Sequence, residues 1–223
     1  MPAVICEKLS DAPPALTLVR EQIYLRKYRR GETIFLAGEQ PEAVYSVRSG
    51  LVKLVAPSVS GREVITELYF PGEVFTLLNA LHGEPYPCSG ICLTDCELEV
   101  LSREAFQREV DRNAGIFITA MRTYQNKVRF QRHMLVELAV GTSERRAAMA
   151  LLMLVDHLGS KVGGHALMPS LLTRQEFSEV IGTTVETAVR ILSRFRKEGI
   201  LSETAHTMTL DLAALRKLSG EEG

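Results

Sequence analysis

Apolar residues in the first half of the chain come in short runs, and each run is followed by a turn signal. Between about residues 23 and 100 the runs are 33–37, 43–47, 51–55, 64–70 and 97–102. Turns such as "RRGE" at 29–32 and "FPGE" at 70–73 separate them. Strands of this length with closely spaced turns predict an antiparallel barrel or sandwich.

A helical period replaces this pattern near residue 113. Steps of four and three residues then connect a series that includes one polar member: Phe117, Met121, Tyr124, Val128, Gln131, Leu135 and Leu138. This spacing predicts a two-helix seam about three heptads long, and therefore a dimer interface. The alternative is a helix that packs on its own domain. We expect Arg122, Lys127, Arg129 and Arg132 to keep much of the remaining circumference solvated, which favours the dimer.

The helical pattern stops at Gly141-Thr142, which we interpret as a hinge. It resumes at 143–158, where Ser143 is the expected N-cap. Glycines at 159, 163 and 164 then predict a loop, and 166–172 is short and extended.

Two short amphipathic segments follow. Thr173 and Glu176 have the capping-box spacing, and so do Thr183 and Glu186 after the turn residue Gly182. At about 100° per residue, one side of the second segment carries Val185, Ala188, Ile191, Leu192 and Phe195, and the other side carries Glu186, Arg190, Arg194 and Lys197. Two short helices around a glycine turn predict a helix-turn-helix, and 201–212 predicts a two-stranded wing.

The polar side of the second helix has the chemistry to read DNA. Arginine can bind O6 and N7 of guanine, and a carboxylate can accept from N4 of cytosine. The simpler interpretation is an ion pair between Glu186 and Arg190, worth about 0.2–0.5 kcal/mol, and the two interpretations are compatible. Hydroxyls and amides near helix starts bind phosphates. The candidate DNA-contacting residues are Thr173, Arg174, Gln175, Thr183, Thr184, Val185, Glu186, Val189, Arg190 and Arg194.

Composition narrows the possible classes of protein. The chain has 223 residues, enough for one large or two small domains, and its net charge of −1 neither favours nor excludes nucleic acid. Its apolar runs are too short to span a bilayer, and its first residues do not resemble a secretory signal, so we expect a cytoplasmic protein without membrane contact. We also expect no enzyme, because the sequence contains no recognisable nucleophile–base set, phosphate-binding glycine loop or metal quartet.

The order of barrel, long helix and winged helix-turn-helix resembles the CRP/FNR family of bacterial transcription regulators. The most specific segment is 172–201, with its threonine-arginine start, glycine turn, Glu-Thr-x-x-Arg core and closing lysine-x-glycine. Residues 28–54 and 69–75 are similar to parts of the family's cyclic-nucleotide-type β-roll. The resemblance implies an α+β fold with an arm (1–20), an antiparallel, jelly-roll-like β-roll (21–112), a dimerisation helix (113–140) and a winged helix-turn-helix (141–223).

The resemblance also implies a function. Glu186 and Arg190 match the family's base-reading acid and arginine, and Val185 and Val189 occupy positions where relatives often carry a residue that tunes the site. A homodimer would bind double-stranded DNA at a pseudo-palindromic site whose half-sites lie about one helical turn apart. We expect a G·C pair flanked by A·T in each half-site, and RNA polymerase as a partner if the protein is an activator.

The sequence also bears on the signal that the protein senses. Cyclic-AMP members place Gly-Glu and Arg-Ser pairs in the phosphate cassette, whereas this chain has Thr76-Leu77 and Tyr86-Pro87 there. We therefore predict no cyclic-nucleotide binding by the usual mode.

Cys88, Cys92 and Cys96 are spaced by four residues, which on a straight strand is ~13 Å, too far apart for one cluster. A bend at Gly90 and a fourth ligand from Cys6 would be needed for an iron–sulfur cluster. Buried thiols, a cluster, thiol redox sensing and haem near His82 stay open as alternatives. A small-molecule module whose winged helix contacts protein is a second functional class.

Overall fold

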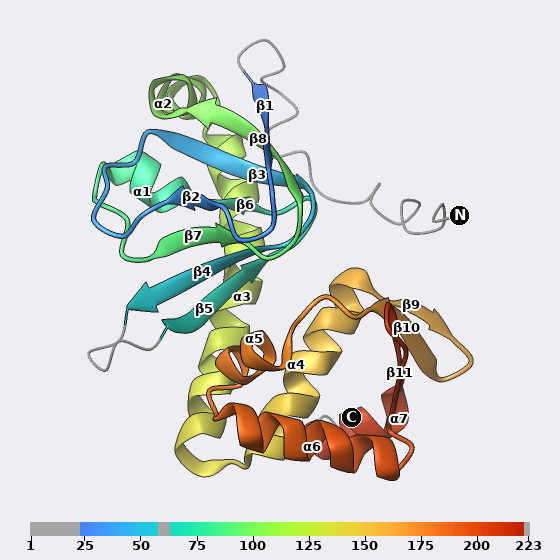
Figure 1. Ribbon diagram of the computed structural model, residues 1–223. Helices are drawn as coiled ribbons and strands as arrows, with labels where there is room; N and C mark the ends of the chain where they lie inside the picture. The colour runs from blue at the N-terminus through green and yellow to red at the C-terminus, as the bar shows by residue number, and fades with distance from the viewer. Residues whose placement is uncertain (1–22, 58–62, 221–223) are drawn as a thin grey trace. The chain divides into compact units, whose positions relative to one another are not determined.

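The computed structural model describes residues 23–57 and 63–220 (Figure 1). Its contacts divide the chain into two compact units, Met1–Val128 and Arg129–Gly223. The division falls within the long helix α3 (Ala114–Val140), for which the sequence predicts a separate segment. No helix in the described part of the chain is both long and apolar enough to cross a membrane.

The first unit contains the predicted antiparallel β-roll. One four-stranded sheet has the order β1 (Tyr24–Tyr28), β8 (Cys96–Ser102), β3 (Ala43–Ser49) and β6 (Val74–Phe75). The other has the order β2 (Thr33–Phe35), β7 (Ser89–Cys92), β4 (Val52–Pro57) and β5 (Glu63–Tyr69). Buried side chains from both sheets form one core, which includes Phe35, Tyr45, Leu54, Phe75 and Leu98. In the first part of β8, apolar and charged residues alternate and bury Cys96, Leu98 and Val100, as expected for a sheet with one face on the core.

Two short helices that the sequence pattern did not predict complete the roll. α1 (Leu77–His82) follows β6, and α2 (Arg103–Arg112) follows β8, where the Ser102 hydroxyl caps it by accepting from the Ala105 amide at 3.2 Å. Both helices contribute to a second cluster of buried apolar side chains that contains Leu77, Ala80 and Phe106.

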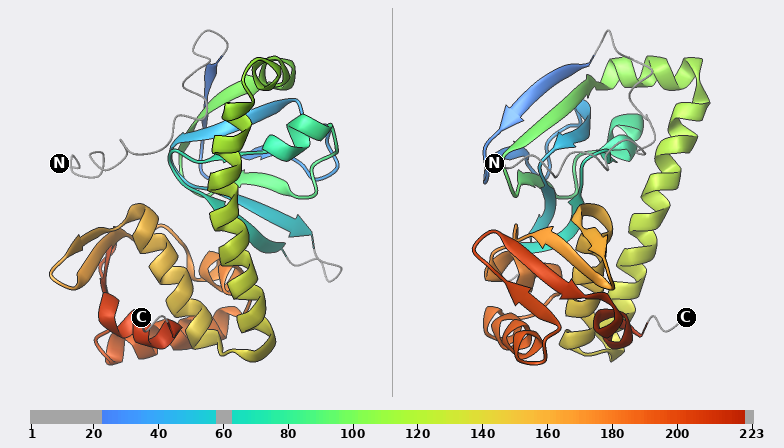
Figure 2. Two further views of the ribbon diagram at one scale, coloured as in Figure 1. Left: turned by 180° about the vertical axis from the view of Figure 1, so that it is seen from behind. Right: turned by 90° about the vertical axis from the view of Figure 1, so that its right-hand side faces the viewer.

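The second unit contains the predicted winged helix-turn-helix, seen from two further sides in Figure 2. α4 (Ser143–Leu158) precedes β9 (Ser160–Val162) and β10 (His165–Pro169). The helix-turn-helix is α5 (Arg174–Val180) and α6 (Val185–Lys197), and β11 (Leu201–Glu203), β12 (Thr207–Asp211) and α7 (Leu212–Ser219) follow. The wing strands β11 and β12 belong to a four-stranded sheet with the order β11-β12-β10-β9, so the sheet is larger than predicted.

The structure corrects two predicted helix caps by one residue each. Thr142, not Ser143, caps α4 and accepts from the Arg145 amide at 3.2 Å. Thr184, not Thr183, caps α6 and accepts from the Thr187 amide at 3.3 Å, so the second predicted capping box does not form. In both cases the residue with an extended backbone makes the cap, and hydroxyl residues side by side do not reveal which one that is. The first capping box, between Thr173 and Glu176, is confirmed.

Lys127 also differs from expectation, because it is half-buried and bound within the protein rather than solvated. Its side chain is only 12% exposed and donates to Glu73 Oε2 at 2.7 Å and to the Leu68 carbonyl at 2.6 Å. Its Nζ lies 4.0 Å from the centre of the Tyr69 ring. The lysine therefore attaches the first part of α3 to the β-roll, whereas Arg129 and Arg132 are exposed as expected. The side chain of Arg122 lies outside the described residues.

Candidate nucleic-acid interface and ligand pocket

Helix α6 has one apolar face and one polar face, as the sequence predicts. The apolar face packs into the second unit, where Ala188, Ile191, Leu192 and Phe195 are all buried. Glu186, Arg190, Arg194 and Lys197 are exposed on the polar face, and Val189 beside them is 42% exposed. Val185 is half-buried at the start of the helix. The polar face is therefore open to a partner.

The start of α6 lowers the pKa of Glu186, the acid on this face. The pKa of Glu186 is lowered, first by a hydrogen bond from its own backbone amide and then by one from the Thr184 hydroxyl. Free amides at a helix N-terminus favour a negative charge, so Glu186 is ionised at neutral pH. Glu186 and Arg190 form no ion pair in the structure, although the sequence spacing permits one.

The arginines near α6 differ in what they bind. Arg174 pairs with Glu203 at 2.5 Å, and Arg196 pairs with the same carboxylate. Arg194 pairs with Glu144 at 2.6 Å and with Glu198 at 2.7 Å. Among the residues that the structure describes, Arg190 has no hydrogen-bond or ion-pair partner. Its guanidinium is therefore the one of these four that is available without breaking a contact inside the protein.

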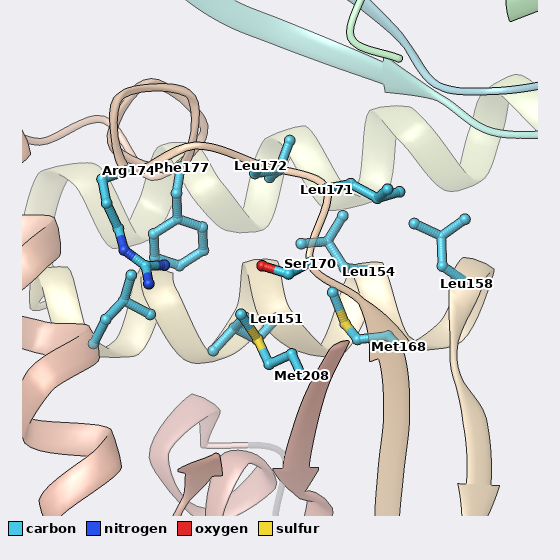
Figure 3. A pocket seen from close by; sticks show the side chains of 11 residues that line it. Leu151, Leu154, Leu158, Met168, Ser170, Leu171, Leu172, Arg174, Phe177 and Met208 are labelled. Carbon is cyan, nitrogen blue, oxygen red and sulfur yellow. The ribbon is translucent and has the colours of Figure 1, made fainter. Parts of the chain in front are cut away.

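Arg174 is placed differently from a typical phosphate contact. Figure 3 shows it beside Phe177, and both side chains extend from α5 toward a pocket lined mainly by leucines and methionines. The methylene groups of an arginine can cover apolar surface in this way while the charged end stays paired. Among its neighbours, Thr173 and Gln175 are exposed, and Gln175 donates to Glu179 at 2.7 Å.

Arg146 is a residue of this unit that the sequence pattern did not single out. It is 7% exposed and donates to the carbonyls of Ile181 at 2.8 Å and Gly182 at 3.4 Å. It also donates to the carbonyl of Glu137 at 3.1 Å. Gly182 has a φ of +62°, so the chain turns there with its carbonyl held by Arg146. The turn between α5 and α6 is thereby fixed to the end of α3. Two adjacent arginines at a helix start are typical of a solvated surface, and the sequence offers no signal that one is buried.

The predicted seam along α3 is exposed at its C-terminal end in the single chain. Leu135 is 67% exposed and Leu138 is 51% exposed. Met121, Tyr124, Val128 and Gln131 are half-buried, and the side chain of Phe117 lies outside the described residues. Met121 and Tyr124 also line a pocket of the β-roll, so this part of the seam is shared with the roll.

That pocket lies where the sequence places the nucleotide cassette. It is partly open to solvent and has a cavity volume of about 110 Å³, and its lining includes Thr76, Leu77, Tyr86 and Pro87. Thr76 has a φ of +66°, a left-handed conformation that favours glycine, and its hydroxyl donates to the Ala43 carbonyl at 2.8 Å. The backbone turn of a glycine is therefore present, but a side chain stands in it.

The pocket carries no positive charge to hold a phosphate. No lysine, arginine or histidine lies among its lining residues in the described part of the chain, and its one charged group is Glu67. Aromatic rings form much of the wall, and the centres of the Phe35 and Tyr86 rings are 4.0 Å apart. A lining of this kind is unfavourable for the phosphate group of a cyclic nucleotide.

Cys88, Cys92 and Cys96 are buried free thiols in the core of the roll. Cys92 and Cys96 hydrogen-bond to each other, which raises the pKa of the first thiol and lowers that of the second. Within residues 23–57 and 63–220 no three His, Cys, Asp or Glu side chains form a group that could hold a metal ion. Cys6 lies outside the described residues. His82 is exposed at the end of α1.

Comparisons with known proteins match both units. Residues 25–113 match the model of the cyclic nucleotide-binding domain, and residues 145–218 match the Crp-like helix-turn-helix domain. The chain is 28% identical to the transcriptional regulatory protein btr of Bordetella pertussis, over all of this chain and 88% of that one.

One further relative and one solved structure are also similar to this chain. The CRP-like cAMP-activated global transcriptional regulator of Mycobacterium tuberculosis is 25% identical over 84% of each chain. The structure of FixK2 from Bradyrhizobium japonicum has a similar fold, with a TM-score of 0.78 and 24% identity over 88% of this chain and 96% of that one.

Proposed function

Because the chain belongs to the CRP/FNR family of transcription regulators, we propose that it acts as a homodimer that reads a pseudo-palindromic DNA site with the polar face of α6. The observation that carries this proposal is the free guanidinium of Arg190 on an exposed face whose other arginine, Arg194, is held by carboxylates. An unpaired arginine loses no protein contact when it binds guanine. Glu186, ionised and one turn earlier, can accept from cytosine.

The other predicted contacts fit a surface around this pair. Thr173, Gln175 and Thr184 are exposed near helix starts, where backbone and side-chain donors bind phosphates. Val189 can contact a thymine methyl, and Val185 and Thr183 are half-buried at the edge of the surface. Arg174 and Arg194 would contact DNA only after giving up Glu203, Glu144 or Glu198, so we rank them below Arg190.

The exposed end of the seam on α3 supports the proposed dimer. Leu135 and Leu138 belong to the series with steps of four and three residues, and both are exposed. A partner helix that covers them would remove this apolar surface from water. A twofold dimer places two copies of α6 for two half-sites about one helical turn apart. If the protein is an activator, RNA polymerase is its further partner.

Control would come from a signal in the β-roll other than cyclic AMP, acting as a shift between two states of the dimer. Gly141, the predicted hinge, lies close to the backbone of α3, because a Cβ there would stand 2.9 Å from the Glu137 carbonyl oxygen. An iron–sulfur or haem regulator of the same fold is the alternative, and the cluster would require Cys6. A winged helix that contacts protein is the second alternative.

The test compares two arginines one turn apart on α6. A preferred operator is first selected from random duplexes with the wild-type protein, and affinities are then measured by fluorescence anisotropy at several salt concentrations. R190A should weaken binding by about 5- to 150-fold, or ~1–3 kcal/mol, and lose discrimination at one base pair per half-site. R194A, the matched control, should keep the wild-type order of preference among sequences.

Equal affinity of wild type and R190A on every duplex would contradict base reading by Arg190. A wild-type affinity that does not fall as salt is added would contradict DNA binding itself and favour the protein-contact alternative.

A further inference from the structure

The β-roll pocket has a charge pattern that selects its ligand. Its lining holds one carboxylate, Glu67, and no cationic side chain in the described part of the chain. Glu67 accepts a hydrogen bond from the Tyr69 hydroxyl, and no ion pair neutralises it among the described residues. A carboxylate without a counter-charge in a partly enclosed site favours a cationic guest.

The walls of the pocket suit the same guest. Phe35, Tyr69, Phe75, Tyr86 and Tyr124 all line it. The ring centres of Phe35 and Phe75 are 6.3 Å apart, and those of Tyr69 and Phe75 are 5.1 Å apart. Aromatic faces attract a cation that has lost its water, and groups of rings recognise ammonium ligands in this way.

Glu67 also acts on its neighbours as a charge inside the pocket. Burial and then the Glu67 carboxylate raise the pKa of the Cys88 thiol to about 11. The same two causes, in the same order, raise the pKa of the Tyr124 hydroxyl. Cys88 precedes β7 and Tyr124 belongs to α3, and both line the pocket together with Glu67, so the carboxylate faces the shared cavity.

We propose that this pocket binds a small organic cation, an alkylammonium or quaternary ammonium compound with an apolar body, through Glu67 and the surrounding rings. The proposal rests on the proposed role of the β-roll as the sensor and names the chemical class of its ligand. The cavity itself has a volume of about 110 Å³, which limits the guest to a small molecule.

The structure also shows how such a ligand would reach α3. A cation on Glu67 competes with the Tyr69 hydroxyl for the carboxylate. The ring of that tyrosine lies under Lys127 of α3, which is bound in turn to Glu73. Occupation of the pocket thus changes contacts of the helix that carries the proposed dimer seam.

The experiment uses the full-length protein and matched pairs of probes. Choline is compared with its uncharged isostere 3,3-dimethyl-1-butanol, and phenethylammonium with 2-phenylethanol, by isothermal titration calorimetry. The tyrosine fluorescence of Tyr69, Tyr86 and Tyr124 gives a second readout. We expect at least one cation to bind at least tenfold more tightly than its uncharged partner.

The variant Glu67→Gln should remove that preference and weaken cation binding by at least tenfold. Glu99→Gln, which removes a half-exposed carboxylate on β8 outside the pocket, should bind like the wild type within twofold. The wild-type comparison of charged and uncharged probes does not depend on how the variants fold.

Equal binding of both members of each pair, or binding of neither cation, would overturn the proposal. Either result leaves the operator measurements with R190A untouched, so a wrong ligand class and a wrong DNA-binding role are separate outcomes.

Discussion

Each unit of the protein holds its own part of α3 with one cationic side chain that is largely shielded from water, and the two cations are satisfied in different ways. In the first unit, Lys127 is neutralised by the carboxylate of Glu73. In the second, Arg146 donates to the carbonyls of Glu137, Ile181 and Gly182 and to the Ser143 hydroxyl at 3.2 Å. The first contact is an ion pair, and the second is a set of helix-end hydrogen bonds.

The difference shows two solutions to the same problem. Carbonyls at helix C-termini lack partners within the helix and carry a partial negative charge, so a guanidinium can stabilise them without a carboxylate. Glu137 is in the last turn of α3, and Ile181 and Gly182 follow α5. One side chain thus caps two helices. A lysine has no planar fork for such a task and needs a counter-charge when buried.

The largest expected effect is that of R146A. It leaves carbonyls at two helix ends without their donor and should destabilise the second unit by about 4 kcal/mol, because each buried group left unsatisfied costs about 1–3 kcal/mol. The measurement is urea unfolding followed by far-ultraviolet circular dichroism, which reports the helices. R146K should recover only part of the loss, since an ammonium does not reproduce the fork.

The control for this variant is R216A, which removes an exposed arginine of α7 and should change stability by no more than about 0.5 kcal/mol. If R146A were as stable as R216A, the capping role of Arg146 would be refuted. A second readout separates the units: all six tyrosines precede residue 129 and the chain has no tryptophan. Tyrosine fluorescence therefore follows the first unit and should respond less to R146A.

The next effect is that of K127M, which leaves Glu73 buried without its cation. Breaking a buried pair from one side costs about 3 kcal/mol, whereas removing both charges is much less costly. The double variant K127M/E73Q should therefore be more stable than K127M alone, as judged by urea unfolding with tyrosine fluorescence. Additive losses in the double variant would show that the two side chains act independently and that the comparison of the two cations is wrong.

The sequence predicts what is periodic and misses what depends on distant partners. The apolar back of α6, its exposed acid and arginine, and the strands of the roll follow from spacing alone. The burial of Lys127 does not, since its partner Glu73 is 54 residues away. The aromatic pocket cannot be predicted from the sequence either, because its walls include residues of β2, β5, β6 and α3, which meet only when the roll closes.

The sequence also does not identify which single residue caps a helix. Adjacent hydroxyl residues at 142–143 and 183–184 satisfy the same cap pattern, and only the backbone decides between them. Thr76 is a different case, because the sequence shows only that it stands where cyclic-AMP relatives carry glycine. Its left-handed φ of +66°, a conformation that favours glycine, is seen only in the structure.

The smallest expected effect distinguishes hydrogen bonds to a carboxylate, which depend on pH, from hydrogen bonds to backbone carbonyls, which do not. Arg146 binds no carboxylate, so acid should affect the second unit mainly through Glu203. Burial raises the pKa of Glu203, but hydrogen bonds from Arg174, Ser170 and Arg196 outweigh this and hold it at about 2. A carboxyl group whose pKa is lowered by folding stabilises the protein above its unfolded pKa of about 4.3 and loses that contribution as the pH falls toward 2.

The variant E203Q should therefore cost about 2 kcal/mol at pH 7, and the difference from wild type should shrink steadily between pH ~4.5 and ~2. Urea unfolding at pH 7, 4 and 2.5, followed by circular dichroism, measures both quantities. E198Q, which loses an exposed pair with Arg194, should differ from wild type by less than about 1 kcal/mol at every pH. A constant difference between wild type and E203Q would mean that packing, not charge, accounts for the contribution of Glu203.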